Sequence, residues 1–379
     1  MRVVHVITGL ETGGAEMMLQ KLTLDHYSST EHIVVSLRTL GTVGSRLREK
    51  GIQVETLNAL SWRKMPAALI RLIALLRELE PDVIQGWMYH GNAAAWLSSR
   101  FLRRAIPLCW TIRCSIDEPK NEKWTTKLLR KMSRLFCGSV EVIIYNSHRA
   151  KAQHEEIGFP QAKGIVIPNG FDTNRFVPSK TNRLRFRKSY GLGDEQSVIG
   201  HVARAHPVKD HLTFLKAAVQ VAAAIPRAIF ILAGRGVPDL GKGSDQIAGL
   251  LQTLGSKVIL LPEQDCVEDL MSSLDVLVLS SVAEGFPNVL GEALSCGVPC
   301  VATDIGDCSA VVGTCGRIVN PRDDLMLASA IGQIVALTPE AWQSLSTKAR
   351  NRAIECYSIE TVAQLYNACW RKADRSREI

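Results

Sequence analysis

The stretch DVLVLSSVAEGFPNVLGEALSCGVPCVATDIG, residues Asp275–Gly306, is the most informative part of the sequence about the fold. It opens with the apolar run DVLVLSS, which is typical of a buried strand in a parallel sheet. A short loop follows, and Pro287 suits the first position of a helix because proline lacks a backbone N–H. We expect this helix to end at Gly297, where glycine allows a left-handed conformation, with Pro299 two residues beyond. The segment therefore predicts a strand–loop–helix unit, the building block of α/β proteins.

Strands and helices alternate along the rest of the chain in the same way, which predicts two α/β domains. The turn-rich connector IVIPNGFDTNRFV, Ile165–Val177, separates two series of apolar runs. We expect a Rossmann-like first domain over residues 1–172 and a Rossmann-like second domain over 173–357. The amphipathic segment over residues 358–379 is predicted to be a helix that packs back on the first domain. The expected strands are Arg2–Thr8, Ile33–Leu37, Val54–Leu57, Asp82–Gln85, Ile106–Ile112, Val140–Tyr145, Ser197–Val202, Ala228–Ala233, Val258–Leu261, Val276–Leu279 and Val298–Ala302.

The composition is that of a globular protein. The 379 residues are 46% hydrophobic and 22% charged, enough to build two cores. No apolar stretch approaches the roughly 20 residues that span a bilayer, and the short apolar start favours a strand over a signal peptide. The ten cysteines include no CxxC pair, which favours a reducing, cytoplasmic location.

Positive charge is concentrated in the first half. The whole chain carries a net charge of +8, and residues 1–172 alone carry +7. This asymmetry predicts that the first domain meets an anionic surface or substrate. No nucleic-acid partner is expected, because the chain has no recognisable DNA- or RNA-reading motif.

The loop after the strand DVLVLSS carries the candidate chemistry. A helix that begins there presents free N–H groups, which bind phosphate. Glu284 lies before the helix and can reach sugar hydroxyls, and Glu292 can accept hydrogen bonds from two ribose hydroxyls. Both could instead be solvated helix charges. Their place at the carboxyl end of a strand, around a Gly-Phe-Pro-Asn turn, favours a ligand site.

The chain resembles glycosyltransferase family 4, retaining enzymes with the GT-B fold, over essentially its whole length. Five segments carry the resemblance: Gly13-Gly14-Ala15-Glu16, IPNGFD (Ile167–Asp172), VARAHPVKD (Val202–Asp210), EGFPNVLGE (Glu284–Glu292) and ALSCGVPCVATDIG (Ala293–Gly306). The resemblance implies two domains that face each other across a cleft. It also implies a nucleoside-diphosphate sugar as the donor, with a UDP-sugar favoured.

The resemblance also assigns roles on the donor side. Arg204 and Lys209 would hold the donor diphosphate and Glu284 the transferred hexose, and these three form the expected catalytic set. Glu292 would bind the ribose. Two cations can neutralise a diphosphate leaving group, so no metal cofactor is expected. The loop and helix start would contact sugar and phosphate through Gly285, Phe286, Pro287, Asn288, Val289 and Leu290.

The expected acceptor side lies in the first domain. Gly13 and Gly14 follow the first strand and allow close approach to a ligand, although a tight strand–helix turn explains them equally well. Glu16 follows in the first helical turn. His90 and Arg113 follow short strands in the contexts WMYHGN and WTIRCS, and Arg113 stands where many family members have a histidine. Arg113 could bind an anionic acceptor or phosphate.

A basic amphipathic segment, Lys123–Cys137 (KWTTKLLRKMSRLFC), is also in the first domain. On a helical wheel its cations, Lys123 and Lys127 among them, share one arc, and its apolar side chains occupy the other. This pattern fits a helix lying on an anionic membrane surface, and also a surface helix packed on the core. The basic segment Trp62–Arg77 adds to the same charge.

We therefore expect transfer of a hexose to a saccharide or a polyprenyl-diphosphate-linked acceptor in bacterial surface polysaccharide synthesis (lipopolysaccharide, O-antigen or capsule). The enzyme would be cytoplasmic and peripheral on the inner membrane face. The surface-polysaccharide subgroup of the family shares the WMYH and WTIR contexts. Two alternatives are a nucleotide-sugar epimerase of the same fold and a non-catalytic nucleotide-sugar-binding partner.

Overall fold

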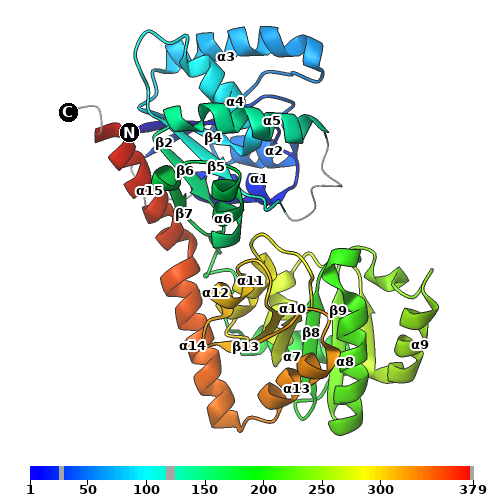
Figure 1. Ribbon diagram of the computed structural model, residues 1–379. Coiled ribbons are helices and arrows are strands. Elements are labelled where there is room, and N and C mark those ends of the chain that lie inside the picture. Colours follow the sequence, from blue (N-terminus) through cyan, green and yellow to red (C-terminus); the bar gives the residue numbers. More distant parts are fainter. Residues whose placement is uncertain (25–29, 117–123, 376–379) are drawn as a thin grey trace. The chain divides into compact units, whose positions relative to one another are not determined.

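The computed structural model describes residues 1–24, 30–116 and 124–375, and the chain forms two compact units (Figure 1). The first unit comprises Met1–Gly170 and Ile359–Ile379, and the second comprises Phe171–Ser358. Each unit is described by itself.

The first unit is built on a parallel sheet of seven described strands. Their order is β3-β2-β1-β4-β5-β6-β7, and β1 pairs with both β2 and β4. The chain therefore reverses its direction of winding between β1 and β4. In open α/β sheets ligands bind at such a switch point, outside the carboxyl ends of the strands. The strands are β1 (Arg2–Ile7), β2 (Glu31–Ser36), β3 (Gln53–Thr56), β4 (Val83–Trp87), β5 (Leu108–Ile112), β6 (Val142–Tyr145) and β7 (Gly164–Val166).

Helices cover both faces of this sheet, because its central strands are buried on both sides. Two apolar clusters, one on each face, form the core. The helices are α1 (Gly14–Thr23), α2 (Gly41–Glu49), α3 (Met65–Leu79), α4 (Met88–Ser99), α5 (Trp124–Phe136), α6 (His148–Glu156) and α15 (Ile359–Arg375).

The C-terminal helix α15 belongs to the first unit, as predicted. Its Trp370 is fully buried, and the indole Nε1 donates a hydrogen bond to Gln85 of β4 at 2.9 Å. Tyr366 stacks on Trp87 with ring centroids 6.3 Å apart. Because these aromatic side chains are buried and their polar atoms are paired, α15 is an integral part of this core.

The second unit repeats the architecture with six described parallel strands in the order β10-β9-β8-β11-β12-β13. Its switch point lies between β8 and β11, which pair directly. The strands are β8 (Ser197–Val202), β9 (Ala228–Ala233), β10 (Val258–Leu261), β11 (Val276–Leu279), β12 (Cys300–Thr303) and β13 (Gly316–Val319). The helices are α7 (Lys180–Ser189), α8 (His211–Ala224), α9 (Asp245–Leu254), α10 (Val267–Ser273), α11 (Asn288–Ser295), α12 (Cys308–Val312), α13 (Asp324–Val335) and α14 (Pro339–Tyr357).

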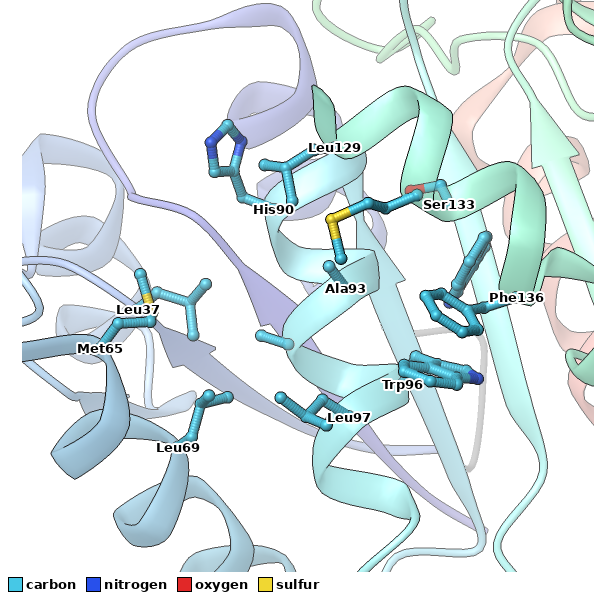
Figure 2. Close-up of a pocket in the computed structure, with 13 residues that line it drawn as sticks. Leu37, Met65, Leu69, His90, Ala93, Trp96, Leu97, Leu129, Ser133 and Phe136 are labelled. Atoms are coloured by element: carbon cyan, nitrogen blue, oxygen red, sulfur yellow. The ribbon is translucent and has the colours of Figure 1, made fainter. Parts of the chain in front are cut away.

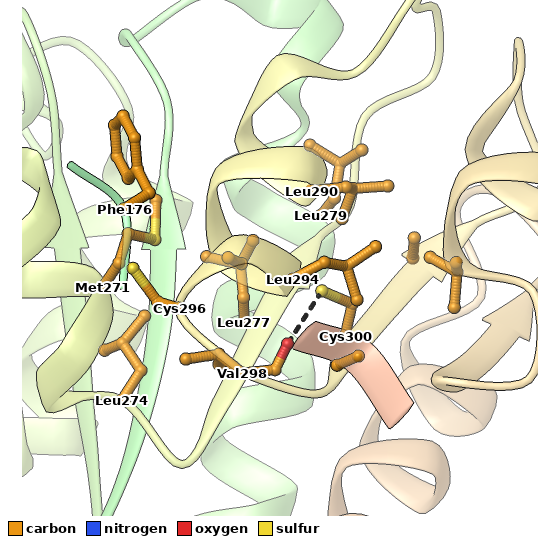
Figure 3. Packing of buried hydrophobic residues seen from close by; sticks show 14 of the residues in the cluster. Phe176, Met271, Leu274, Leu277, Leu279, Leu290, Leu294, Cys296, Val298 and Cys300 are labelled. Carbon is orange, nitrogen blue, oxygen red and sulfur yellow. Dashed lines mark hydrogen bonds between the residues drawn. The ribbon is translucent and has the colours of Figure 1, made fainter. Parts of the chain in front are cut away.

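The core of the second unit fixes the position of α11. Leu290 and Leu294, one helical turn apart, pack with Leu277 and Leu279 of β11 in one buried cluster (Figure 3). Full burial of each leucine contributes about 1.5–3 kcal/mol. The face of α11 that carries Leu290 is thus held on the sheet, which orients the rest of its first turn.

The predicted fold class is confirmed: both units are doubly wound parallel sheets of the Rossmann type. The predicted elements differ from the structure mainly at their ends. The turn-rich connector begins with strand β7, which the sequence analysis missed because it has only three residues before the Pro-Asn-Gly turn. Strand β13 was not predicted either. Helix α11 begins at Asn288. Pro287, predicted to be the first helical residue, is instead the N-cap residue directly before the helix. Gly297 follows the helix with φ +69°, so the predicted glycine stop is present.

Among the described residues, no single helix is long and apolar enough to cross a membrane. The pair α13 and α14 meets the length and composition criteria only when taken together, and the two helices are bent by 108° at their junction.

Candidate functional site

The switch point of the second unit brings the loops after β8 and β11 together. Lys209, in the loop after β8, forms an ion pair with Glu284, in the loop after β11. Both side chains are mostly buried, at 19% and 12% exposure. Two catalytic residues predicted from separate motifs therefore lie in direct contact.

Local hydrogen bonds hold Lys209 in place. It ends a short 3-10 turn, Pro207–Lys209, immediately before α8. Asp210 has the left-handed φ of +47° and caps α8 by accepting a hydrogen bond from the Thr213 N–H at 3.2 Å. The Ser280 hydroxyl lies 3.0 Å from the Lys209 carbonyl, so the end of β11 contacts the backbone of this turn.

The Glu284 carboxylate is positioned from its own loop. The Ser281 hydroxyl donates to Glu284 Oε1 at 2.8 Å, which leaves this oxygen shared between Ser281 and Lys209. Gly306 approaches the Glu284 carbonyl so closely that a Cβ there would lie 2.3 Å from the oxygen. Because Gly306 also has φ +53°, only glycine fits without strain.

The start of α11 is anchored by aromatic packing. The ring of Phe286 stacks on Phe171 at 6.3 Å and meets Tyr357 edge-on at 6.1 Å between centroids. Gly291 is required beside this cluster, since a Cβ there would lie 2.1 Å from the Phe171 ring. The loop EGFPN therefore enters the helix at a fixed angle.

These elements enclose a polar pocket of about 490 Å³, called the donor pocket below. It brings together most of the predicted donor-side residues: Arg204, Lys209, Glu284, Phe286, Pro287, Asn288, Val289 and Glu292. Gly285 and Leu290 do not line it. The Leu290 side chain is fully buried in the core, so only its backbone is available to a ligand.

Arg235 and Gln264 also line the donor pocket, and the sequence analysis assigned them no role. Arg235 follows β9 in the sequence GRG, and Gln264 follows β10 in the sequence PEQ. Their positions directly after strands could have identified them as candidate site residues. Gly234 has φ +150°, and a Cβ there would lie 2.2 Å from the Ala203 carbonyl oxygen. This close approach of the loops after β8 and β9 brings Arg235 into the same lining as Arg204 and Lys209, so the pocket holds three cations where two were predicted.

In the first unit, the glycines after β1 form a strand–helix turn. Gly13 precedes α1, and the Glu16 carboxylate folds back over it, 2.4 Å from where a Cβ would stand. Burial raises the pKa of Glu16, partly offset by a hydrogen bond from its own backbone N–H. Gly14 begins the helix, with open space around its Cα.

His90 lies in the first turn of α4, on the other side of this switch point. Met88, which begins the helix, has φ +60°, a left-handed value that costs a side-chain-bearing residue roughly 1–3 kcal/mol. Burial, and then the charge of Arg38 in the loop after β2, lower the pKa of His90. Gly9 of the β1 loop is 3.9 Å from the Arg38 side chain, measured from an ideal Cβ. The loops after β1, β2 and β4 therefore converge near His90.

Arg113 is held by the protein itself. Its Nη1 donates to the Tyr366 hydroxyl at 2.7 Å, its Nη2 donates to Asn169, and its guanidinium lies 5.7 Å over the Trp87 ring. Burial lowers the pKa of this arginine, while Tyr366 opposes the shift. These contacts connect Arg113, which follows β5, to α15 and to Asn169, which lies just before the unit boundary at Gly170.

The predicted amphipathic helix is present as α5, and Lys123 lies outside the described residues. Its apolar side chains divide into two sets. Leu129 and Phe136 pack against the core. Four others are exposed at intervals of four, four and three residues: Trp124 (73%), Leu128 (47%), Met132 (43%) and Leu135 (74%). The segment Trp62–Arg77 forms η1 (Trp62–Lys64) and most of α3.

Comparison with known proteins agrees with this geometry. Residues 13–175 match the family described as Glycosyltransferase Family 4, and residues 196–336 match Glycosyl transferases group 1. The putative glycosyltransferase EpsF of Bacillus subtilis (strain 168) is 24% identical over 314 residues, 80% of this chain and 79% of EpsF. The UDP-Gal:alpha-D-GlcNAc-diphosphoundecaprenol alpha-1,3-galactosyltransferase of Escherichia coli is 25% identical over 301 residues, 77% of this chain and 76% of that enzyme.

Solved structures share the fold over the whole chain. Anabaena HepE in complex with UDP superposes with a TM-score of 0.82 at 22% identity, covering 98% of this chain and 100% of HepE. Its complex with UDP-glucose gives 0.78 at 21% identity, with 98% and 99% coverage. WaaG, a glycosyltransferase involved in lipopolysaccharide biosynthesis, gives 0.65 at 13% identity, with 96% and 99% coverage.

The fold and the two family matches define a GT-B glycosyltransferase. The chain belongs to glycosyltransferase family 4 and is similar to bacterial polysaccharide and lipopolysaccharide glycosyltransferases. This membership favours glycosyl transfer over the epimerase and the non-catalytic alternative.

Proposed function

We propose that this protein is a retaining hexosyltransferase that uses a nucleoside-diphosphate sugar, with UDP as the favoured nucleotide. Its acceptor would be a saccharide or a lipid-linked saccharide of bacterial surface polysaccharide synthesis. The observation that carries the proposal is the donor pocket, in which cations, carboxylates and a helix start converge at the switch point of one sheet. The HepE complexes with UDP and UDP-glucose support the choice of nucleotide.

The second unit would bind the donor. Arg204, Lys209 and the N–H groups at the start of α11 would hold the diphosphate, because cations and free amides both favour a concentrated negative charge. Glu292 would accept hydrogen bonds from the ribose hydroxyls. Glu284 would accept them from the hexose. The backbone of Gly285–Leu290 would contact sugar and phosphate.

The ion pair between Lys209 and Glu284 suits this task. Each partner holds the other side chain in place before the donor enters. When the diphosphate binds, it competes with Glu284 for the ammonium group, and the carboxylate becomes available to the sugar. The pair therefore orders both groups in the empty pocket.

Transfer would break the bond between the anomeric carbon and the diphosphate oxygen and form a bond to the acceptor oxygen on the same face. The electron pair leaves with the diphosphate, whose growing charge Arg204 and Lys209 stabilise. The acceptor hydroxyl proton passes to the departing phosphate oxygen. Arg235 is placed to add a third cation at the same pocket.

The first unit would bind the acceptor. Gly13 and Gly14 allow close approach at its switch point, and Glu16 and His90 stand beside it. The contacts of Arg113 to Tyr366 and Asn169 favour a positioning role for this arginine over direct acceptor binding.

The first unit would also contact an anionic membrane surface through α5. Four large apolar side chains on this helix are exposed, in the stripe Trp124, Leu128, Met132 and Leu135. A surface helix packed only on the core would leave this stripe polar. Cations flank it on the same helix, which fits a helix lying in the interface of anionic lipids.

Product analysis with radiolabelled UDP-hexoses and membrane extract tests the proposal. We expect wild-type protein to attach the sugar to an acceptor with retained configuration, and Glu284→Ala to abolish transfer while the protein stays folded. Formation of an epimerised nucleotide sugar without any added acceptor would contradict it. Lys348→Ala, an exposed charge change on α14, is the matched control.

A further inference from the structure

The first unit contains an apolar pocket between α3, α4 and α5, called the apolar pocket below. It has a volume of about 350 Å³, within the usual range for small-ligand sites. Figure 2 shows α3 contributing Met65 and Leu69, and α5 contributing Leu129 and Phe136. Among the described residues that line it, His90 alone has an ionisable side chain.

One face of α4 forms the floor. His90, Ala93, Ala94 and Leu97 follow the spacing of a single helical face, and all four line the pocket. Two of them are alanines, so the space above the helix is empty because the side chains are small. His90 and Leu97 lie two turns apart, which gives the pocket one polar end and one apolar end (Figure 2).

An aromatic wall stabilises the pocket near Leu97. Trp96 and Phe136 stack with ring centroids 3.9 Å apart, and the Trp96 indole donates to the Ser139 hydroxyl at 2.8 Å. The Arg100 guanidinium lies over the Trp96 ring, with its carbon 5.3 Å from the ring centroid. These contacts connect α4 to α5, so the pocket is a built feature of the unit.

The apolar pocket is continuous with the exposed stripe of α5. Met132 belongs to both: it lines the pocket and is 43% exposed. Leu97, at 38% exposure, also reaches solvent from the lining. An apolar molecule that reaches α5 from a membrane surface therefore has a path into the pocket along apolar side chains.

The positive charge near the apolar pocket favours a ligand with an anionic headgroup. The helix α5 carries Lys127, Arg130, Lys131 and Arg134 and no acidic residue. At the polar end of the pocket, His90 and Leu37 both line the cavity, and Arg38 follows Leu37 directly in the chain. Burial, and then the charge of Arg38, lower the pKa of His90. An anionic headgroup attached to an apolar chain matches both features.

We propose that the apolar pocket holds the hydrocarbon chain of a prenyl-diphosphate-linked acceptor, with the diphosphate at His90 and Arg38. The proposal rests on the proposed function and narrows its acceptor class. A free saccharide would leave its hydroxyls without hydrogen-bond partners against this lining, which opposes binding. A hydrocarbon chain would gain binding free energy in proportion to the apolar area that it buries there.

Isothermal titration of the full chain with farnesyl diphosphate tests the proposal, with saturating UDP present to occupy the donor pocket. Farnesol and inorganic diphosphate are the probes that lack one half of the ligand. We expect farnesyl diphosphate to bind at least ten-fold more tightly than either. Ala93→Phe, which fills the pocket, should weaken its binding ten-fold or more.

Two further variants separate chain binding from headgroup binding. Leu97→Gln, at a partly exposed lining position, should weaken farnesyl diphosphate and farnesol alike. Arg38→Ala should weaken farnesyl diphosphate and inorganic diphosphate and leave farnesol binding unchanged. Ala74→Phe, an exposed alanine of α3 outside the lining, is the matched control and should leave all affinities unchanged.

Equal affinities of the Ala93→Phe and Ala74→Phe variants for farnesyl diphosphate would overturn the proposal. So would farnesyl diphosphate binding no tighter than inorganic diphosphate. Failure of the proposed function would appear separately, as wild-type protein that does not bind UDP. The melting temperature and UDP affinity of each variant identify any that fail to fold.

Discussion

The donor pocket of the second unit and the apolar pocket of the first unit lie on sheets of the same winding but differ in chemistry. The donor pocket lies at the carboxyl edge of its sheet and is lined by arginine, lysine and glutamate side chains. The apolar pocket lies between three helices, and its lining is apolar except for His90, Ser133 and the indole groups of two tryptophans.

Under the two proposed assignments, one scaffold separates two recognition tasks. A charged diphosphate needs many fixed donors, and parallel strands deliver them at a common edge. A hydrocarbon chain needs only space and exclusion of water, which alanines on one helix face provide.

Removing a donor-pocket cation should have the largest effect. We expect Lys209→Ala to lower kcat by about 10²–10³-fold, because the leaving diphosphate loses a charge partner in a partly buried site. Steady-state transfer kinetics measure this change. Lys348→Ala should keep wild-type kcat, and a Lys209→Ala enzyme of normal kcat would show that the diphosphate binds elsewhere.

Glu284 and Glu292 of the donor pocket should differ in their effect on UDP binding, because they are assigned to different parts of the donor. Glu292→Ala should weaken UDP binding roughly 10–100-fold, the cost of losing hydrogen bonds to a charged acceptor. Glu284→Ala should change UDP affinity by less than about three-fold, since UDP lacks the hexose. Titration with UDP measures both. The reverse order of effects would exchange the two assignments.

A single methyl group should disrupt the donor pocket. Gly234→Ala would place a Cβ 2.2 Å from the Ala203 carbonyl at φ +150°, so the loops after β8 and β9 must move apart. We expect a loss of about 1–3 kcal/mol in the free energy of unfolding, together with weaker UDP binding. Chemical denaturation gives the first quantity. Gly249→Ala, on α9 with open space around it, should be neutral or stabilising.

Removing apolar groups from the stripe of α5 should affect membrane binding and leave stability nearly unchanged. Leu128→Ser with Leu135→Ser should reduce flotation with anionic liposomes several-fold. The melting temperature should hardly change, because exposed substitutions usually alter stability by less than about 0.5 kcal/mol. A large fall in melting temperature would instead place these side chains in a packed core.

Acid should destabilise both units by a similar mechanism. Burial lowers the pKa of His32 and His154 in the first unit, and of His211 in the second, to about 4. Their unfolded pKa is near 6.5, so the unfolded chain binds more protons between pH 6.5 and 4, and stability falls as the pH drops through that range. We expect roughly 1–2 kcal/mol for each histidine by pH 5. Urea denaturation at several pH values measures the loss, and a rise in stability on acidification would contradict the sign.

The sequence predicted most of the fold because apolar strands and helix stops are local signals. The run DVLVLSS and the stop at Gly297 appear in the structure as expected. The three-residue strand β7 escaped prediction, since its pairing with β6 is a tertiary contact. Helix α14 was not assigned from the sequence, because its buried and exposed residues do not form a clear amphipathic pattern.

The donor pocket was predicted in its main residues because each follows a strand within a specific motif. The contacts within the pocket could not be predicted from the sequence. No local pattern indicates that Lys209 pairs with Glu284, or that Gly234 brings Arg235 into the lining. The apolar pocket was equally invisible, since alanines on a helix face predict close packing as readily as empty space. Arg113 illustrates the same limit, because its partners Tyr366 and Asn169 are 253 and 56 residues away.

Hydrogen–deuterium exchange with and without UDP tests the assignment of the donor pocket most directly. We expect UDP to slow exchange in the turn around Arg204–Lys209 and at the first amides of α11. Protection that spares both of these segments would contradict it.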